Sequence, residues 1–89
     1  MRINKDFTIQ KVGSSYVAVA VGETSRTFQG MIRLNETGAF LWQHLSAGEC
    51  SEGELVDAIL EAYEVDRETA ENDVRRVVEV LKKHRIILQ

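Results

Sequence analysis

The chain has 89 residues, of which 44% are hydrophobic, and this suits one compact domain with a modest core. We therefore expect a single domain over residues 1–89. Eleven Lys and Arg residues against 14 Asp and Glu residues give a net charge of -3, which opposes the phosphate attraction that drives nucleic-acid binding. No nucleic-acid partner is expected.

The thiol and the two imidazoles of the chain do not form a recognisable reactive site. Cys50 is the single cysteine, so an internal disulfide is excluded, and neither Cys50 nor His44 and His84 has the spacing of a zinc site. No base is placed beside Cys50, so we expect an inert thiol and two surface histidines. No apolar stretch reaches the roughly 18 residues of a membrane span. We expect a cytoplasmic protein without membrane association, metal, cofactor or catalytic residues.

The N-terminal part alternates between apolar and polar side chains, with turn signals between the runs, which is typical of short antiparallel strands. Three strands are predicted, over residues 7 to 11 or 12, 16–21 and 27–34. In the third strand, Phe28, Ile32 and Leu34 share one face and Gly30 lies inside the strand.

Three helices are predicted in the C-terminal part, because apolar residues recur there at helical spacing. The expected N-caps are Asn35, Ser51 and Asp66, with Glu54 completing a capping box. The first helix is expected to end at Gly48 and the third at about His84. The apolar faces comprise Ala39, Phe40, Trp42 and Leu45, then Leu55, Val56, Ile59 and Leu60, then Ala70, Val74, Val77, Val78 and Leu81. Residues 86–88 suit either a short strand or an apolar tail packed on the core.

Two segments resemble a known family. Leu-Asn-Glu-Thr-Gly-Ala at residues 34–39 and Asp-Val-Arg-Arg-Val-Val-Glu-Val-Leu at residues 73–81 are similar to two signatures of the pyrroloquinoline-quinone biosynthesis protein D family. The likeness covers roughly residues 28–87. The chain lacks the Pro-Glu-Gly that precedes the first signature, and His-Arg-Ile-Ile at residues 84–87 replaces a typical Gly-Trp ending. A related module that serves another peptide pathway is therefore expected.

The resemblance implies an α+β domain similar to winged helix-turn-helix proteins, with a three-stranded antiparallel meander followed by three helices. It implies a non-enzymatic chaperone that binds the leader of a ribosomally made precursor peptide and presents it to a modifying enzyme, often a radical S-adenosylmethionine protein. In this family the leader adds as a strand to the edge of the third strand, in a groove against the third helix. The implied peptide-binding residues are Phe28, Gln29, Gly30, Met31, Ile32, Arg33, Asp73, Arg76, Val77 and Val80.

Several of these residues also have a purely structural interpretation. Phe28 and Ile32 suit the inward face of a strand, where apolar side chains form the core. Val80 lies off the centre of the third helix's apolar face, so it is expected to be partly accessible, as a peripheral core residue or as a groove contact. Asp73 suits an ion pair with Arg76, a contact that sets the register of the leader, or a solvated charge.

Two other classes of function remain open on the sequence alone. Basic residues gather late in the third helix, where a winged-helix regulator contacts DNA, but acidic residues dilute them and cations are common at helix C-termini. A purely structural subunit is the other alternative. The leader-binding interpretation accounts for more of the sequence than either.

Overall fold

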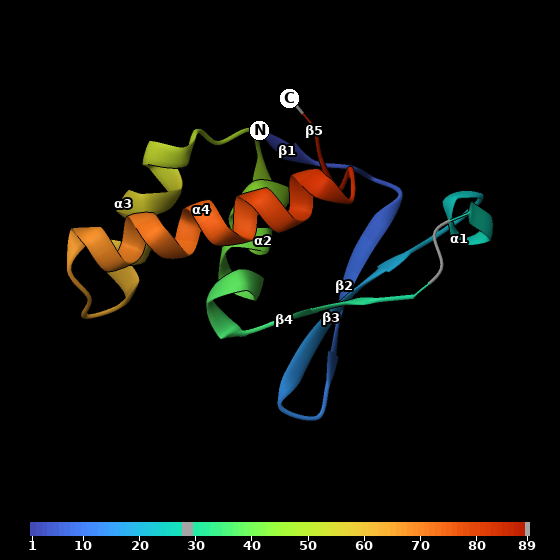
Figure 1. Ribbon diagram of the computed structural model, residues 1–89, viewed down its shortest axis with the longest axis horizontal. Coiled ribbons are helices and arrows are strands. Elements are labelled where there is room, and N and C mark those ends of the chain that lie inside the picture. Colours follow the sequence, from blue (N-terminus) through green and yellow to red (C-terminus); the bar gives the residue numbers. More distant parts are fainter. Residues whose placement is uncertain (28–29, 89) are drawn as a thin grey trace.

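A three-stranded antiparallel sheet and three long helices make up most of the molecule (Figure 1). The computed structural model describes residues 1–27 and 30–88. The strands of the sheet are β2 (Phe7–Val12), β3 (Ser15–Ala20) and β4 (Ile32–Leu34), in the order β2-β3-β4. A one-turn helix, α1 (Thr24–Thr27), comes between β3 and β4, and the long helices are α2 (Glu36–Ala47), α3 (Glu52–Ala62) and α4 (Arg67–Lys83). The expected α+β order of a sheet followed by helices is confirmed.

The sheet turns one face towards the helices, as the alternation of its side chains predicts. Ala18 in β3 is fully buried and pairs with Ile32 of β4, while Tyr16 pairs with the buried Leu34. Phe7 pairs with Ala20 at the other side of the sheet and is 7% exposed. These residues lie on one face because successive side chains of a strand point to opposite faces.

The third strand is shorter than the predicted span of residues 27–34. Its first predicted residue, Thr27, instead ends α1, where Ser25 Oγ donates to the Gly22 carbonyl at 2.6 Å and the Arg26 amide donates to the Glu23 carbonyl at 3.0 Å. Such local hydrogen bonds compete with the ladder of a sheet. Gly30 does not lie inside the strand, because its φ of +103° places it in a bend. Residues 28 and 29 lie outside the described residues.

A second, two-stranded ladder joins the two ends of the described chain. β1 (Arg2–Ile3) pairs antiparallel with β5 (Ile87–Leu88), and the Asn4 amide donates to the carbonyl of Ile86 at 2.7 Å. Ile86 is fully buried. The C-terminal segment is therefore a strand that follows a core residue, which settles the alternative left open by the sequence, while β1 was not predicted.

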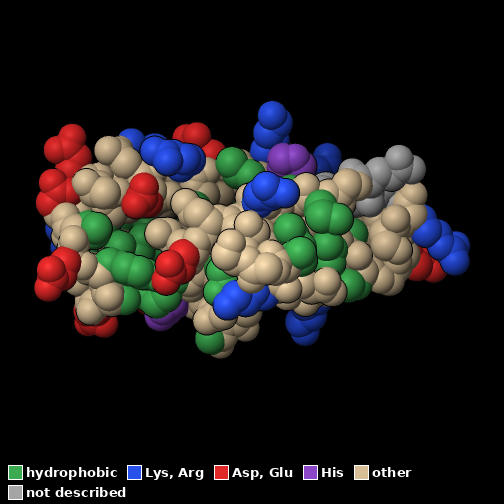
Figure 2. Space-filling view, turned by 90° about the horizontal axis from the view of Figure 1, so that it is seen from below, with side chains coloured by type: hydrophobic (Ala, Val, Ile, Leu, Met, Phe, Trp, Pro, Cys, Tyr) green, Lys and Arg blue, Asp and Glu red, His purple; other side chains and the backbone are tan. Residues whose placement is uncertain are grey.

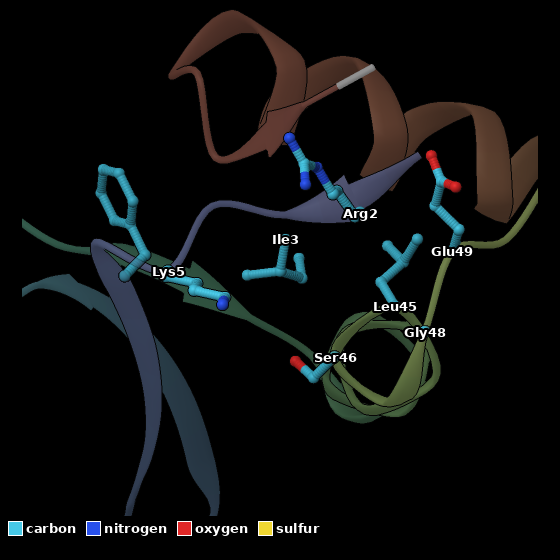
Figure 3. A pocket seen from close by; sticks show the side chains of 8 residues that line it. Arg2, Ile3, Lys5, Leu45, Ser46, Gly48 and Glu49 are labelled. Atoms are coloured by element: carbon cyan, nitrogen blue, oxygen red, sulfur yellow. The ribbon is translucent and has the colours of Figure 1, made fainter.

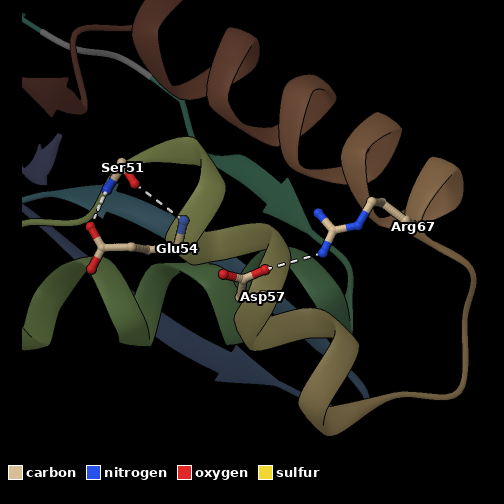
Figure 4. Close-up of polar contacts among 4 residues, drawn as sticks. All are labelled: Ser51, Glu54, Asp57 and Arg67. Carbon is tan, nitrogen blue, oxygen red and sulfur yellow. Dashed lines mark hydrogen bonds and ion pairs between the residues drawn. The ribbon is translucent and has the colours of Figure 1, made fainter.

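All three predicted N-caps form. Asn35 Oδ1 accepts from the Gly38 amide at 2.8 Å, and Asp66 Oδ1 accepts from the Thr69 amide at 2.9 Å. Ser51 and Glu54 make a reciprocal capping box, and Arg67 and Asp57 make an exposed ion pair at 3.5 Å between α4 and α3 (Figure 4). These caps explain why each helix begins where the sequence predicts.

Capping hydrogen bonds lower the pKa of two carboxyl groups. Hydrogen bonds from the backbone and side chain of Ser51 lower the pKa of Glu54, and hydrogen bonds from Thr69 lower the pKa of Asp66. A carboxyl group whose pKa is lower in the folded chain stabilises the fold at neutral pH. This stabilisation is fully present above the pKa of the unfolded-state carboxyl group. It is lost as the pH falls from that value through the lower pKa of the folded state.

The apolar faces of the long helices are largely buried, with three residues at their margins. Trp42 is 3% exposed and anchors the core as expected, together with Leu41, Leu45, Leu55, Ile59, Val74, Val78 and Leu81. Phe40, Leu60 and Val77 are only half-buried. They lie at the edges of their helices' apolar faces, where neighbouring elements cover one side of the side chain. No helix within residues 1–27 and 30–88 is long and apolar enough to cross a membrane.

Helix α4 ends in a Schellman motif built around an arginine. The Ile86 amide donates to the Leu81 carbonyl at 2.8 Å, and the Arg85 amide donates to the Lys82 carbonyl at 3.0 Å. Arg85 has a φ of +59°, in the left-handed region where the motif usually has glycine. A side chain with a Cβ is strained in this conformation, at a cost of roughly 1 to 2 kcal/mol.

We predict that Arg85→Gly raises the free energy of unfolding by about 1 kcal/mol, because glycine adopts the left-handed conformation without the steric cost. Urea denaturation followed by circular dichroism measures the change. Arg85→Ala is the matched control, since it removes the guanidinium but keeps the Cβ, and it should bring no such gain. Equal stabilisation by both variants would show that the arginine side chain, and not the backbone conformation, is unfavourable.

Candidate functional site

Strand β4 offers a free edge. One edge pairs with β3, and within the described residues no strand lies along the other. The three residues of β4 span about 10 Å, and outward-facing N–H and C=O groups along such an edge can pair with an incoming strand. β2 is the opposite terminal strand of the sheet, and no strand of the described part of the chain lies along its outer side, so the sheet has a second free edge that the sequence did not predict.

Four of the predicted site residues lie in or just before β4. Ile32 is half-buried and packs against the core, whereas Arg33 is exposed and pairs with Val17 on the outer face. Met31 precedes the strand with 66% of its surface exposed, and Gly30 lies in the bend before it. The two remaining residues of the predicted edge, Phe28 and Gln29, lie outside the described residues.

The other four predicted residues lie along one flank of α4. Val77 and Asp73 are half-buried, and Arg76 is exposed. Val80 is 38% exposed, whereas Val78 on the same helix is 2% exposed. The expectation that Val80 is partly accessible is therefore confirmed, and Val77 and Val80 form an apolar flank beside the buried face.

Within the described residues, Asp73 does not form an ion pair with Arg76, its basic neighbour one helical turn away. Structural pairing therefore does not explain either residue. Both side chains are available to a ligand or to solvent.

Helix α2 lies beneath both groups of residues. β4 packs on α2 and β3, and α4 packs on α2 and α3, so the strand and the helix share a support (Figure 1). Ile32 and Val77 both pack against the same hydrophobic core. We call the following eight residues the β4–α4 surface: Gly30, Met31, Ile32, Arg33, Asp73, Arg76, Val77 and Val80.

Charges of both signs are mixed along the exposed side of α4. Arg75, Arg76, Lys82 and Lys83 are exposed, and so are Glu68, Glu71 and Glu79. Figure 2 shows a group of hydrophobic side chains over the strands, with Lys and Arg side chains around it. The exposed side of α4 therefore carries mixed charges, and the face seen in Figure 2 offers apolar contacts bordered by charges rather than a continuous basic surface of the kind that binds phosphates.

The described residues contain no cluster suited to a metal ion. Within residues 1–27 and 30–88, no three His, Cys, Asp or Glu side chains gather closely enough to hold one. The Cys50 Sγ lies 3.6 Å from the carbonyl oxygens of both His44 and Gly48, either of which can accept its one proton, and the His44 ring packs against Phe40 at an interplanar angle of 59°, with 4.6 Å between centroids. These contacts give the thiol and the imidazole structural partners.

Tyr63 is a third residue whose pKa departs from its ordinary value, and the main cause is burial. Desolvation raises the pKa of Tyr63, and the charges of Glu36 and Tyr16 raise it further. The Tyr63 ring meets Phe40 edge to face, with 5.4 Å between centroids.

A pocket of about 560 Å³ lies elsewhere, between β1, the segment that joins β1 to β2, and the C-terminal end of α2 (Figure 3). Sequence reasoning missed its residues, because β1 is only two residues long and pairs with a strand at the far end of the chain. The alternation of Arg2, Ile3 and Lys5 was the signal available in the sequence.

Comparisons with known proteins relate the chain to leader-peptide-binding proteins. A family model described as coenzyme PQQ synthesis protein D (PqqD) matches residues 16–87, which confirms the resemblance seen in the sequence. Among curated proteins, no match to the chain was found.

Two solved structures are similar to nearly the whole chain, each with a TM-score of 0.74. The first is TbiB1 in complex with the TbiA(beta) leader peptide, which is 27% identical over 97% of this chain and 93% of its own. The second is lasso peptide synthetase B1 complexed with the leader peptide, which is 25% identical over 99% of this chain and 96% of its own. The similarity spans the sheet and all three long helices.

We predict that Val80→Asp lowers the free energy of unfolding by less than about 1 kcal/mol, because its side chain already meets water. Val78→Asp is the matched control on the same helix. It buries an unpaired carboxylate and should cost more than about 3 kcal/mol. Urea denaturation of both variants measures the free energy of unfolding. If Val80→Asp lowers it as much as Val78→Asp does, Val80 belongs to the core.

Proposed function

This chain belongs to the coenzyme PQQ synthesis protein D family, and we propose that it is a non-catalytic chaperone that binds the leader of a ribosomally made precursor peptide. The observation that carries the proposal is the similarity, over 97% and 99% of the chain, to two proteins whose structures are complexes with leader peptides. The free edge of β4 supplies a physical means of holding an extended peptide.

In the proposed mode, the leader adds as a strand to β4 and lies against α4. Backbone hydrogen bonds to the edge provide affinity that does not depend on sequence, because they use N–H and C=O groups alone. Ile32, Val77 and Val80 receive apolar side chains of the leader, and these contacts provide selectivity. Phe28 and Gln29, which lie outside the described residues, belong to the proposed site because the family likeness implies them.

The charged residues of the β4–α4 surface are proposed to set the register of the leader. Arg33 lies on the strand, and Asp73 and Arg76 lie one helical turn apart on α4. Because these charges have no ion-pair partner among the described residues, a leader side chain of opposite charge would gain an interaction without breaking one.

The proposed role also requires a modifying enzyme to which the bound precursor is presented. The family likeness implies a radical S-adenosylmethionine enzyme, and the missing Pro-Glu-Gly and Gly-Trp segments favour a pathway other than that of the quinone. The encounter is placed in the cytoplasm, where precursor peptides are made. A precursor gene beside a gene for such an enzyme would support this assignment, and a genomic neighbourhood without any precursor gene would oppose it.

We predict that the leader of a precursor peptide encoded beside the gene for this chain shifts amide resonances within residues 28–34 and 73–80 of the 15N-labelled chain. Val80→Asp should weaken binding about tenfold, roughly 1.4 kcal/mol, because it places a charge where an apolar anchor of the leader is proposed to lie. Val65→Asp is the matched control, since Val65 is also 38% exposed but lies in the connection between α3 and α4.

The positions of the shifts separate the alternatives. Shifts confined to residues 7–12 would assign the leader to the free edge of β2 instead of β4. Equal affinity of the Val80 variant and the parent chain, with the variant folded, would remove α4 from the site. Saturating titration without any shift would refute peptide binding by this domain.

A further inference from the structure

The pocket between β1 and α2 is built from a small apolar floor and a charged rim. Its lining residues are Arg2, Ile3, Lys5, Phe7, Leu45, Ser46, Gly48 and Glu49. Phe7 is 7% exposed and Leu45 is 2% exposed, so the floor is continuous with the hydrophobic core. Its volume of about 560 Å³ lies in the usual range for ligand sites, roughly 300 to 1,000 Å³.

Hydrogen bonds between segments far apart in the sequence, together with one local turn, hold the walls of this pocket in place. Ile3 pairs with Ile87 in the ladder of β1 and β5, and the Cys50 amide donates to the carbonyl of Met1 at 3.0 Å. At the other end of the wall, Asn4 Oδ1 accepts from the amide of Asp6 at 3.0 Å. The pocket is therefore preformed, and a ligand would not have to order its walls.

Charges of opposite sign, those of Lys5 and Glu49, stand at its two ends, and Arg2 adds a second positive charge on the rim. Figure 3 shows Lys5 at one end and Glu49 at the other, with Ile3 and Leu45 between them. Lys5 and Glu49 make no ion pair within the described residues, and both are exposed. A ligand that places a carboxylate by Lys5 and a cation by Glu49 would complement both ends.

The openness of the rim favours a protein segment over an enclosed small molecule. Arg2, Lys5, Ser46, Gly48 and Glu49 are all exposed, so the pocket covers a ligand from one side only. Small-molecule sites usually bury most of the ligand surface, whereas one side chain projecting from a protein needs only a shallow apolar seat with a polar rim.

We infer that this pocket is a second docking site, which accepts an apolar side chain of a protein partner that lies between an acidic and a basic side chain. None of its eight lining residues belongs to the β4–α4 surface, so the two sites share no residue. The inference does not depend on which peptide binds at β4.

The test uses three blocked peptides with the 15N-labelled full chain. Acetyl-Asp-Gly-Phe-Gly-Lys-amide should shift amide resonances within residues 2–7 and 45–49. Acetyl-Lys-Gly-Phe-Gly-Lys-amide should bind about threefold more weakly, as expected for the loss of one exposed ion pair. Acetyl-Asp-Gly-Ser-Gly-Lys-amide should bind more weakly still, because it has no apolar anchor.

A charge reversal then identifies the residue responsible. Lys5→Glu should reverse the preference between the two Phe peptides, whereas Lys82→Glu, the same change on the exposed end of α4, should leave it unchanged. Binding of the leader should be the same in both variants and the parent, which keeps this test separate from that of the leader site.

Three outcomes would overturn the inference. One is an absence of shifts in residues 2–7 and 45–49 with all three peptides. Another is equal affinity for the Phe and Ser peptides, which would show that the charges alone cause the binding and that the pocket does not receive an apolar side chain. The third is displacement of the Phe peptide by the leader, which would make the pocket an extension of the leader site.

Discussion

The burial of α2 on several sides is the constraint on which the other elements depend. Leu41, Trp42 and Leu45 are each 3% exposed or less, and they come from one helix of 12 residues. Around α2 pack β1, β3 and β4 from the two ladders and the helices α3 and α4. Because interiors are close-packed, a shift of this helix would move all five neighbours.

The junction of β4 and α2 fixes the position of the free edge of β4 relative to the buried helix. Leu34 ends the strand in the core, and the next residue, Asn35, caps the helix. A Cβ on Gly38 would lie 3.3 Å from both the Leu34 Cβ and the Asn35 Oδ1, which is tight, so glycine lets the first turn of α2 lie directly against the strand. The Leu-Asn-x-Thr-Gly pattern thus has a physical reason, which is to hold the edge strand at a fixed angle to the helix.

Helix α2 also connects the two surfaces to which binding roles are assigned. Its N-terminus follows β4, and Leu45, Ser46 and Gly48 at its C-terminal end line the pocket beside β1. A helix of 12 residues is about 18 Å long, so β4 and the pocket lie at opposite ends of this element. Such a spacing suits a chaperone that holds a precursor at one end and a second protein at the other.

Much of the local structure could be read from the sequence, because its signals act over a few residues. The caps at Asn35, Ser51 and Asp66, the ends of the long helices and the partial exposure of Val80 follow from side-chain hydrogen bonds and helical spacing. The prediction of a strand over residues 27–34 was wrong at its start, because alternation alone does not show that Thr27 ends a turn of helix or that the chain bends at Gly30.

Only the tertiary structure decided which segments meet across the chain. The pairing of Ile3 with Ile87 joins two strands of only two residues each, which are too short to predict from alternation, and it exists because Ile87 lies in the core and Ile3 packs against it. The pocket beside β1, the second free edge at β2 and the absence of a pair between Asp73 and Arg76 within the described residues likewise depend on packing between distant residues. The sequence by itself determined where the three long helices and the first two strands of the sheet form and which family the chain resembles, since these depend on local patterns. The sites depend on the relative placement of elements, which local patterns do not contain.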